Sequence, residues 1–102
     1  MAFNLISKSQ IREFKAISSS INSSFSRCFG EFGLAKAGII ILNEAWKPEK
    51  QAGIIRVNNN YVDQLKASLA MIKEIEGKEV IVKSLGVSGM LNKAENYLEQ
   101  RR

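Results

Sequence analysis

Apolar residues recur along the chain with helical spacing in two segments, separated by runs of β-branched residues. Residues 11–28 place an apolar side chain at every third or fourth position, which is one face of a long helix. Residues 61–75 repeat this spacing and predict a second helix that ends at Gly77. The two stripes contain Ile11, Phe14, Ile17, Ile21, Phe25 and Cys28, and then Tyr61, Leu65, Leu69, Ile72 and Ile75.

The ends of the first helix are marked by residues that favour helix termini. Ser7 stands three residues before Gln10, the spacing of a capping box in which each side chain satisfies a free amide of the other. Gly30 and Gly33 follow the stripe, and glycine readily adopts the left-handed conformation that ends a helix. We therefore expect the helix to begin after Ser7 and to end at these glycines.

The runs between the helices predict strands, and their order predicts the fold. Strand, helix, strand, strand, helix, strand is the order of a ferredoxin-like βαββαβ sandwich, a four-stranded antiparallel sheet with two helices on one face. Several strands are apolar at successive positions, so we expect the second face of the sheet to be covered at least in part. The predicted strands are Ala2–Ile6, Ala35–Leu42, Ala52–Asn58 and Glu79–Leu85.

A third helix is predicted after the last strand, because Ser88 can cap a segment with one apolar side. The length of 102 residues suits one domain with one modest core. We expect a single domain over residues 1–102, with the sandwich core at 1–87 and the added C-terminal helix at 88–101.

The charge balance favours an anionic partner. The chain has 15 Lys and Arg against 10 Asp and Glu, a net charge of +5. Such a chain attracts anions by steering and by counterion release. The basic residues are scattered, so charge alone does not identify a nucleic-acid site.

The same composition excludes several kinds of chemistry. One cysteine and no histidine exclude an intramolecular disulfide and a Cys/His zinc site. Cys28 lies on the apolar stripe, so we expect a small core residue rather than a nucleophile. Glu74, Glu76 and Glu79 lack a recognisable metal-binding loop. Neither a signal peptide nor a membrane-spanning run is evident, and we expect an intracellular protein without a membrane partner.

Two segments around the second helix carry a family resemblance. They are Gly53-Ile54-Ile55-Arg56-Val57-Asn58 and Leu85-Gly86-Val87-Ser88-Gly89. The region from Gly53 to Gly89 resembles the small Pop-type protein subunit of archaeal and eukaryotic ribonuclease P, also called protein component two. The resemblance implies a non-catalytic subunit that supports the catalytic RNA in removing the 5′ leader of precursor tRNA. It also implies that Mg²⁺ is used by the RNA and that the protein itself binds no cofactor.

The resemblance implies partners and a cellular location as well. The partners are ribonuclease P RNA, a TIM-barrel-like ribonuclease P protein subunit and, indirectly, precursor tRNA. The two proteins would form a heterotetramer in which this chain dimerises. Such a complex works in the cytoplasm, or in the nucleus and nucleolus of a eukaryote.

The candidate RNA-binding residues are basic side chains and a glycine-serine turn. The strand that carries Arg56 has no aromatic residue, so we expect contacts to phosphates rather than base stacking. The guanidinium of Arg56 can hold a phosphate in two bonds, although an arginine that only reaches solvent has the same pattern. The candidates are Arg56, Lys83, Ser88, Gly89 and Lys93.

The turn before the predicted third helix has two possible roles. The amides at Ser88 and Gly89 can hold an anion at a helix start, or Ser88 can simply cap the helix. The family usually has threonine where this chain has Met90, and Lys93 takes the place of a basic residue.

Two other function classes share this fold. A ferredoxin-like regulatory module would bind a small molecule, and an acylphosphatase-type hydrolase would need a glycine-rich phosphate loop that the chain lacks. The first helix also carries a serine-rich face, which either faces solvent or allows close approach of a helix or an RNA backbone. Its members are Ser18, Ser19, Ser20, Ser23, Ser24 and Ser26.

Overall fold

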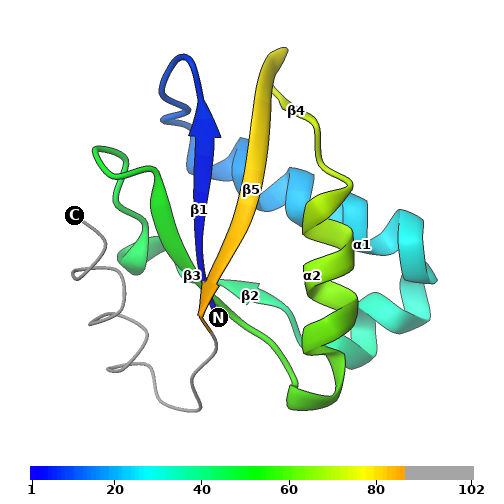
Figure 1. Cartoon of the computed structure of the whole chain (residues 1–102). Coiled ribbons are helices and arrows are strands. Elements are labelled where there is room, and N and C mark those ends of the chain that lie inside the picture. The colour runs from blue at the N-terminus through cyan, green and yellow to red at the C-terminus, as the bar shows by residue number, and fades with distance from the viewer. Residues whose placement is uncertain (87–102) are drawn as a thin grey trace.

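The computed structural model describes residues 1–86, which form a five-stranded antiparallel sheet and two helices (Figure 1). The order of strands in the sheet is β2-β3-β1-β5-β4, and all neighbouring pairs are antiparallel. The α+β prediction is confirmed, whereas the predicted four-stranded sheet is corrected by one additional strand, β4. The strands are β1 (Ala2–Ser7), β2 (Ile40–Ile41), β3 (Ala52–Arg56), β4 (Glu74–Ile75) and β5 (Lys78–Gly86).

The additional strand exists because the second helix ends earlier than its apolar stripe. This helix, α2, spans Val62–Ala70, and the buried Ile75 reaches the core from β4 instead. Glu76 and Gly77 form the two-residue turn between β4 and β5, with φ values of 53° and 75°. Positive φ at both positions is typical of a hairpin turn that matches the twist of the strands. Gly77 is therefore a turn residue, and its prediction as a helix end is wrong.

The start of the first helix also differs from the prediction. Helix α1 spans Phe14–Ala37, and no side chain caps its N-terminus at Glu13. Ser7 remains in β1, where it is paired with Val80, and its hydroxyl donates to the backbone oxygen of Ser9 at 2.6 Å. The capping box does not form because the sheet extends through Ser7.

The end of α1 lies beyond the predicted glycines. Gly30, with φ 77°, kinks α1 without ending it, and Gly38 ends it in the left-handed conformation with φ 61°. The residues 35–37 of the predicted strand Ala35–Leu42 are therefore helical, and β2 is short. Cys28, predicted in the core, is exposed because the buried stripe of α1 is interrupted between Phe25 and Ala37.

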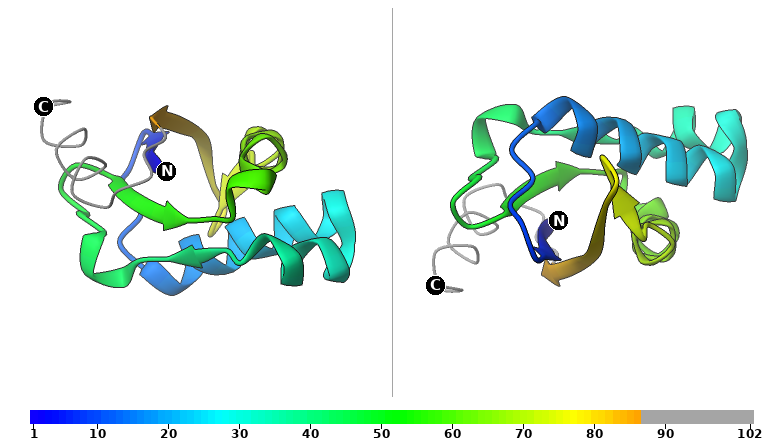
Figure 2. Two further views of the ribbon diagram at one scale, coloured as in Figure 1. Left: turned by 90° about the horizontal axis from the view of Figure 1, so that it is seen from below. Right: turned by 90° about the horizontal axis from the view of Figure 1, so that it is seen from above.

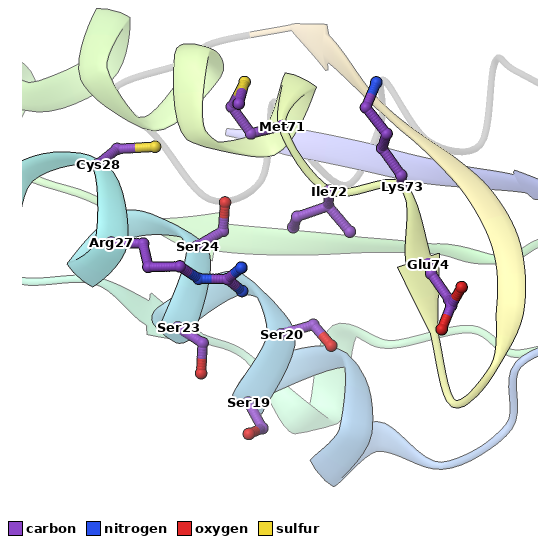
Figure 3. Close-up of a pocket in the computed structure, with 10 residues that line it drawn as sticks. All are labelled: Ser19, Ser20, Ser23, Ser24, Arg27, Cys28, Met71, Ile72, Lys73 and Glu74. Carbon is purple, nitrogen blue, oxygen red and sulfur yellow. The ribbon is translucent and has the colours of Figure 1, made fainter.

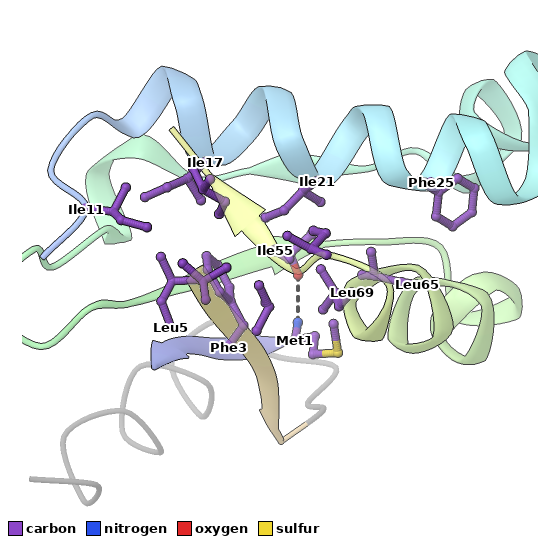
Figure 4. Close-up of a cluster of buried hydrophobic side chains, with 14 of the residues drawn as sticks. Met1, Phe3, Leu5, Ile11, Ile17, Ile21, Phe25, Ile55, Leu65 and Leu69 are labelled. Atoms are coloured by element: carbon purple, nitrogen blue, oxygen red, sulfur yellow. Dashed lines mark hydrogen bonds between the residues drawn. The ribbon is translucent and has the colours of Figure 1, made fainter. Parts of the chain in front are cut away.

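Both helices pack on one face of the curled sheet, and the main core lies between the helices and this face (Figure 2). Phe3 and Ile55 supply this core from the sheet, Ile17 and Ile21 from α1, and Leu65 from α2 (Figure 4). The amino group of Met1 donates to the backbone oxygen of Ile55 at 2.6 Å. Removing this much apolar surface from water is the main driving force for the fold.

The opposite face of the sheet, called the open face below, is covered at one end. Ala2, Ala52 and Ile54 are buried there in a second, smaller cluster with Leu42 and Ala45. Coverage of the second face, expected from the doubly apolar strands, is thus seen in part. The predicted C-terminal helix at 88–101 lies outside the described residues. Within residues 1–86, neither helix has the length and hydropathy required to cross a membrane.

Candidate nucleic-acid interface

Arg56 and Lys83, the two described candidates, both project from the open face. Asn4 of β1 is the register partner of Ala52 on one side and of Lys83 on the other, so these three side chains share a face. Arg56 is four residues beyond Ala52 in the same strand and therefore points the same way. Both basic side chains are exposed, as a phosphate ligand requires.

The structure does not bring these two side chains together. Strand β1 lies between β3 and β5, and Arg56 is at the far end of its strand from the level of Lys83. Two strand spacings across the sheet and four residues along it separate their Cα atoms by roughly 15 Å. They can contact different phosphates of one RNA but cannot form a single binding fork.

The neighbours of the two basic residues differ. Arg56 lies opposite the exposed Ile40 of β2, and Lys83 lies opposite the half-buried Asn4. Neither the side chain of Arg56 nor that of Lys83 makes a hydrogen bond or an ion pair with any other described residue. Both cations are consequently available to an anionic partner.

An apolar pair lies on the same face. Ile6 of β1 and Ile81 of β5 are direct register partners, with 46% and 59% of their surfaces exposed. From the sequence, this part of β5 is predicted only as an apolar run, and Ile81 is not among the predicted surface residues. Period-two alternation with the buried Val80 and Val82 is the signal that could have identified it.

Three further candidates, Ser88, Gly89 and Lys93, lie outside the described residues, so they stay predictions. The serine-rich face of α1 divides into two parts. Ser24 is buried and donates to the backbone oxygen of Ser68 at 2.7 Å, which lets α1 and α2 approach closely. Ser19 and Ser23 are exposed.

Comparisons with known proteins agree over almost the whole chain. The family model described as "Rpp14/Pop5 family" matches residues 1–99. The chain is 34% identical over 101 residues to "Ribonuclease P protein component 2" of Pyrococcus furiosus, covering 98% of this chain and 82% of the relative. It is 31% identical over 80 residues to "Ribonuclease P/MRP protein subunit POP5" of Schizosaccharomyces pombe, covering 78% of this chain and 58% of the relative.

A solved structure supports the fold. A chain of "Cryo-EM structure of yeast Ribonuclease MRP" superposes with a TM-score of 0.60 at 16% identity, over 98% of this chain and 84% of that chain. The family resemblance noted from the segments around Arg56 and Ser88 is confirmed by the match across residues 1–99. The chain belongs to the Rpp14/Pop5 family.

Proposed function

We propose that this chain is a non-catalytic protein subunit of ribonuclease P, which supports the catalytic RNA in removing the 5′ leader of precursor tRNA. The observation that carries the proposal is the family match over residues 1–99, together with relatives named ribonuclease P protein component 2. In this proposal the Mg²⁺-dependent hydrolysis belongs to the RNA subunit. The role of the protein is to hold that RNA in its active conformation.

The open face of the sheet is suited to this role. Arg56 and Lys83 are exposed cations at separate places on one sheet face, each without a partner in the described residues. Phosphate contacts of this kind fix the position of a protein on RNA without reading its sequence. Ser88, Gly89 and Lys93 complete the proposed RNA-binding set.

The protein partner in this proposal is a TIM-barrel-like ribonuclease P subunit, joined in a heterotetramer through dimerisation of this chain. The structure is consistent with such a contact, because the exposed Ile6 and Ile81 are neighbours on one sheet face and a protein partner could bury both. The complex would work in the cytoplasm, or in the nucleus and nucleolus if the cell is eukaryotic.

A purification of the tagged chain from its own cells tests the proposal. The tag belongs at the C-terminus, because Met1 is buried and its amino group donates to the backbone oxygen of Ile55. We expect ribonuclease P RNA and a TIM-barrel-like protein to co-purify, and the purified complex to cleave precursor tRNA. Enrichment of other RNAs without ribonuclease P RNA would contradict the proposal.

Reconstitution tests more directly whether the protein stabilises the active RNA. The ribonuclease P RNA alone is assayed for precursor-tRNA cleavage over a Mg²⁺ titration, with and without the protein partners. Including this chain should lower the Mg²⁺ concentration needed for cleavage, because the protein replaces Mg²⁺ in neutralising phosphates. An unchanged Mg²⁺ dependence would argue against a stabilising role.

A further inference from the structure

A groove runs along the helical side of the molecule, away from the open face. It lies between α1 and the connection from α2 to β4, and its volume is about 650 Å³ (Figure 3). One wall is the stripe of α1 that includes Ser20, Ser23 and Arg27, and the other wall carries Met71, Lys73 and Glu74. The position of the groove makes it independent of Arg56 and Lys83.

Both walls of the groove supply a cation. Arg27 comes from α1 and Lys73 from the connection after α2, and both side chains are exposed. Neither side chain makes a hydrogen bond or an ion pair with another described residue. A protein that leaves an arginine and a lysine unpaired beside exposed hydroxyls offers the donors that phosphate oxygens accept.

The floor of the groove is partly apolar. Ile72 is buried below it, and Met71 is 63% exposed at its edge. Ser24 is tied to the backbone oxygen of Ser68, so the two helices are held together at this point. A fixed floor with apolar patches between cationic walls suits a nucleotide, whose base and sugar have apolar faces next to a charged phosphate.

Glu74 narrows the class of ligand. Its carboxylate lines the groove without a partner in the described residues, and an ionised carboxylate can only accept hydrogen bonds. A ligand that presents a hydrogen-bond donor close to its phosphates therefore matches the groove best. The 2′-hydroxyl of ribose is such a donor, and it is the group by which a protein distinguishes RNA from DNA.

We propose that this groove is a second RNA site, which holds a single-stranded segment with its phosphates on Arg27 and Lys73 and a ribose hydroxyl on Glu74. The inference rests on the proposed function for the class of partner and adds a surface on the opposite side of the sheet. RNA held by both surfaces would be contacted across the whole protein.

Fluorescence anisotropy of the full chain with a labelled oligouridine, over a salt titration, tests the site. Losing two phosphate contacts to a single strand reduces the salt slope by about 1.4 and weakens binding roughly 10- to 30-fold near 0.1 M salt. We expect this of the double substitution Arg27→Ala with Lys73→Ala. The matched control is Lys15→Ala with Lys66→Ala, which removes the same charge from exposed helical positions outside the groove.

Glu74→Ala gives a second test, in which the affinity for a nucleic acid should increase rather than decrease. It removes a negative charge from the groove, so affinity for a deoxyoligonucleotide of equal length should rise. Affinity for RNA should rise less or fall, since the ribose hydroxyl loses its acceptor, and the preference for RNA over DNA should shrink. An equal rise for both nucleic acids would overturn the role given to Glu74.

Cys28 can report RNA binding in the groove of the wild-type protein, without any substitution in the proposed site. It is exposed, it lines the groove, and the chain has one cysteine. Saturating oligouridine should slow its alkylation by a neutral maleimide several-fold. In the control Cys28→Ser with Lys66→Cys, the thiol lies on α2 outside the groove and its alkylation rate should be unaffected by RNA.

The outcomes separate this inference from the proposed function. If wild type co-purifies with ribonuclease P RNA but the Arg27/Lys73 variant binds oligouridine with unchanged affinity and salt slope, the groove site is wrong and the proposed function stands. If the variant loses a protein partner while its RNA binding is intact, the groove is a protein interface and the inference is again overturned. Loss of oligouridine binding together with Cys28 protection in wild type supports it.

Discussion

The side chain of Gln51 makes two hydrogen bonds to the backbone of Ile11 across 40 residues of sequence. Its amide oxygen accepts from the Ile11 N–H at 2.9 Å, and its amide nitrogen donates to the Ile11 oxygen at 3.0 Å. Gln51 is buried in the left-handed conformation with φ 51°. The segment between β1 and α1 has no sheet partner of its own. The Gln51 side chain therefore makes the two backbone hydrogen bonds that a neighbouring strand would otherwise make to Ile11.

Gln51→Ala should lower the free energy of unfolding by about 2–4 kcal/mol, because it leaves two buried backbone groups of Ile11 without partners. Urea denaturation followed by circular dichroism measures the change. The control is Gln10→Ala on the exposed neighbouring loop, which should change stability by less than about 0.5 kcal/mol. Equal effects of the two substitutions would show that the Gln51 bonds contribute little.

Gly53 lies under an aromatic stack and has no space for a side chain. The rings of Phe3 and Trp46 are stacked with centroids 6.1 Å apart, and a Cβ on Gly53 would meet them at 3.0 to 3.1 Å. Gly53→Ala should therefore destabilise the fold by about 1–3 kcal/mol through overpacking. In a double-mutant cycle with Trp46→Ala, the double substitution should destabilise the fold by less than the sum of the two single losses, and strict additivity would rule out a clash with Trp46.

The turn at Glu76 and Gly77 offers a stabilising change. Glu76 has φ 53°, and the neighbouring Glu74 and Glu79 are direct register partners of the same charge. Glu76→Asn should raise stability by about 0.5–1 kcal/mol, since asparagine tolerates this conformation and one of three clustered acids is removed. Gly77→Ala, at φ 75°, is the contrasting change and should lower the midpoint of thermal unfolding.

Much of the fold follows from the sequence pattern because its main signals are local. The helical stripes placed Ile17, Ile21, Leu65 and Leu69 correctly in the core. The errors lie at element ends, where tertiary contacts outweigh local preference. Ser7 pairs in the sheet instead of capping a helix, and Ile75 reaches the core from a strand rather than from a helix face.

The candidate site was less predictable for a related reason. The sequence places Arg56 and Lys83 on strands but does not show their distance, which depends on the register of β1 with both neighbours. The groove near Arg27 was also beyond sequence reasoning. Its second wall exists because α2 stops at Ala70, a boundary that the apolar stripe conceals.

The amino group of Met1 provides a pH-dependent prediction. Burial lowers the pKa of this group below its usual value of 8.0, because the charged form loses water. The unfolded chain then binds more protons than the folded chain between the lowered pKa and 8, so stability rises with pH across that window. We expect the urea midpoint of a Cys28→Ser background to increase toward pH 8 and then level.

N-terminal acetylation is the control for this effect, because it removes the titrating charge while keeping an N–H that can donate to Ile55. The acetylated protein should lose the pH dependence in this window. A direct titration of ¹³C-labelled Met1 by NMR should give a midpoint below 8. An ordinary midpoint would show that the amino group is solvated in the folded protein.

Neutralising phosphate contacts on the proposed RNA-binding set should weaken assembly with ribonuclease P RNA without affecting the fold. Arg56 is exposed and unpaired among the described residues, so Arg56→Ala removes no structural contact there, and Lys93→Ala is its predicted companion. Each loss should reduce the salt slope by about one unit and weaken binding to all sequences similarly. The effect should be largest at low Mg²⁺, where fewer other cations neutralise the RNA.

Filter binding of ribonuclease P RNA over a salt titration measures this slope for the wild type, each single substitution and the double substitution. Lys36→Ala with Lys66→Ala, on exposed helical positions away from the open face, controls for net charge. Circular dichroism confirms that the variants fold. If the double substitution leaves both the affinity and the salt slope at their wild-type values, Arg56 and Lys93 are solvated side chains, and the RNA contacts lie elsewhere on the protein.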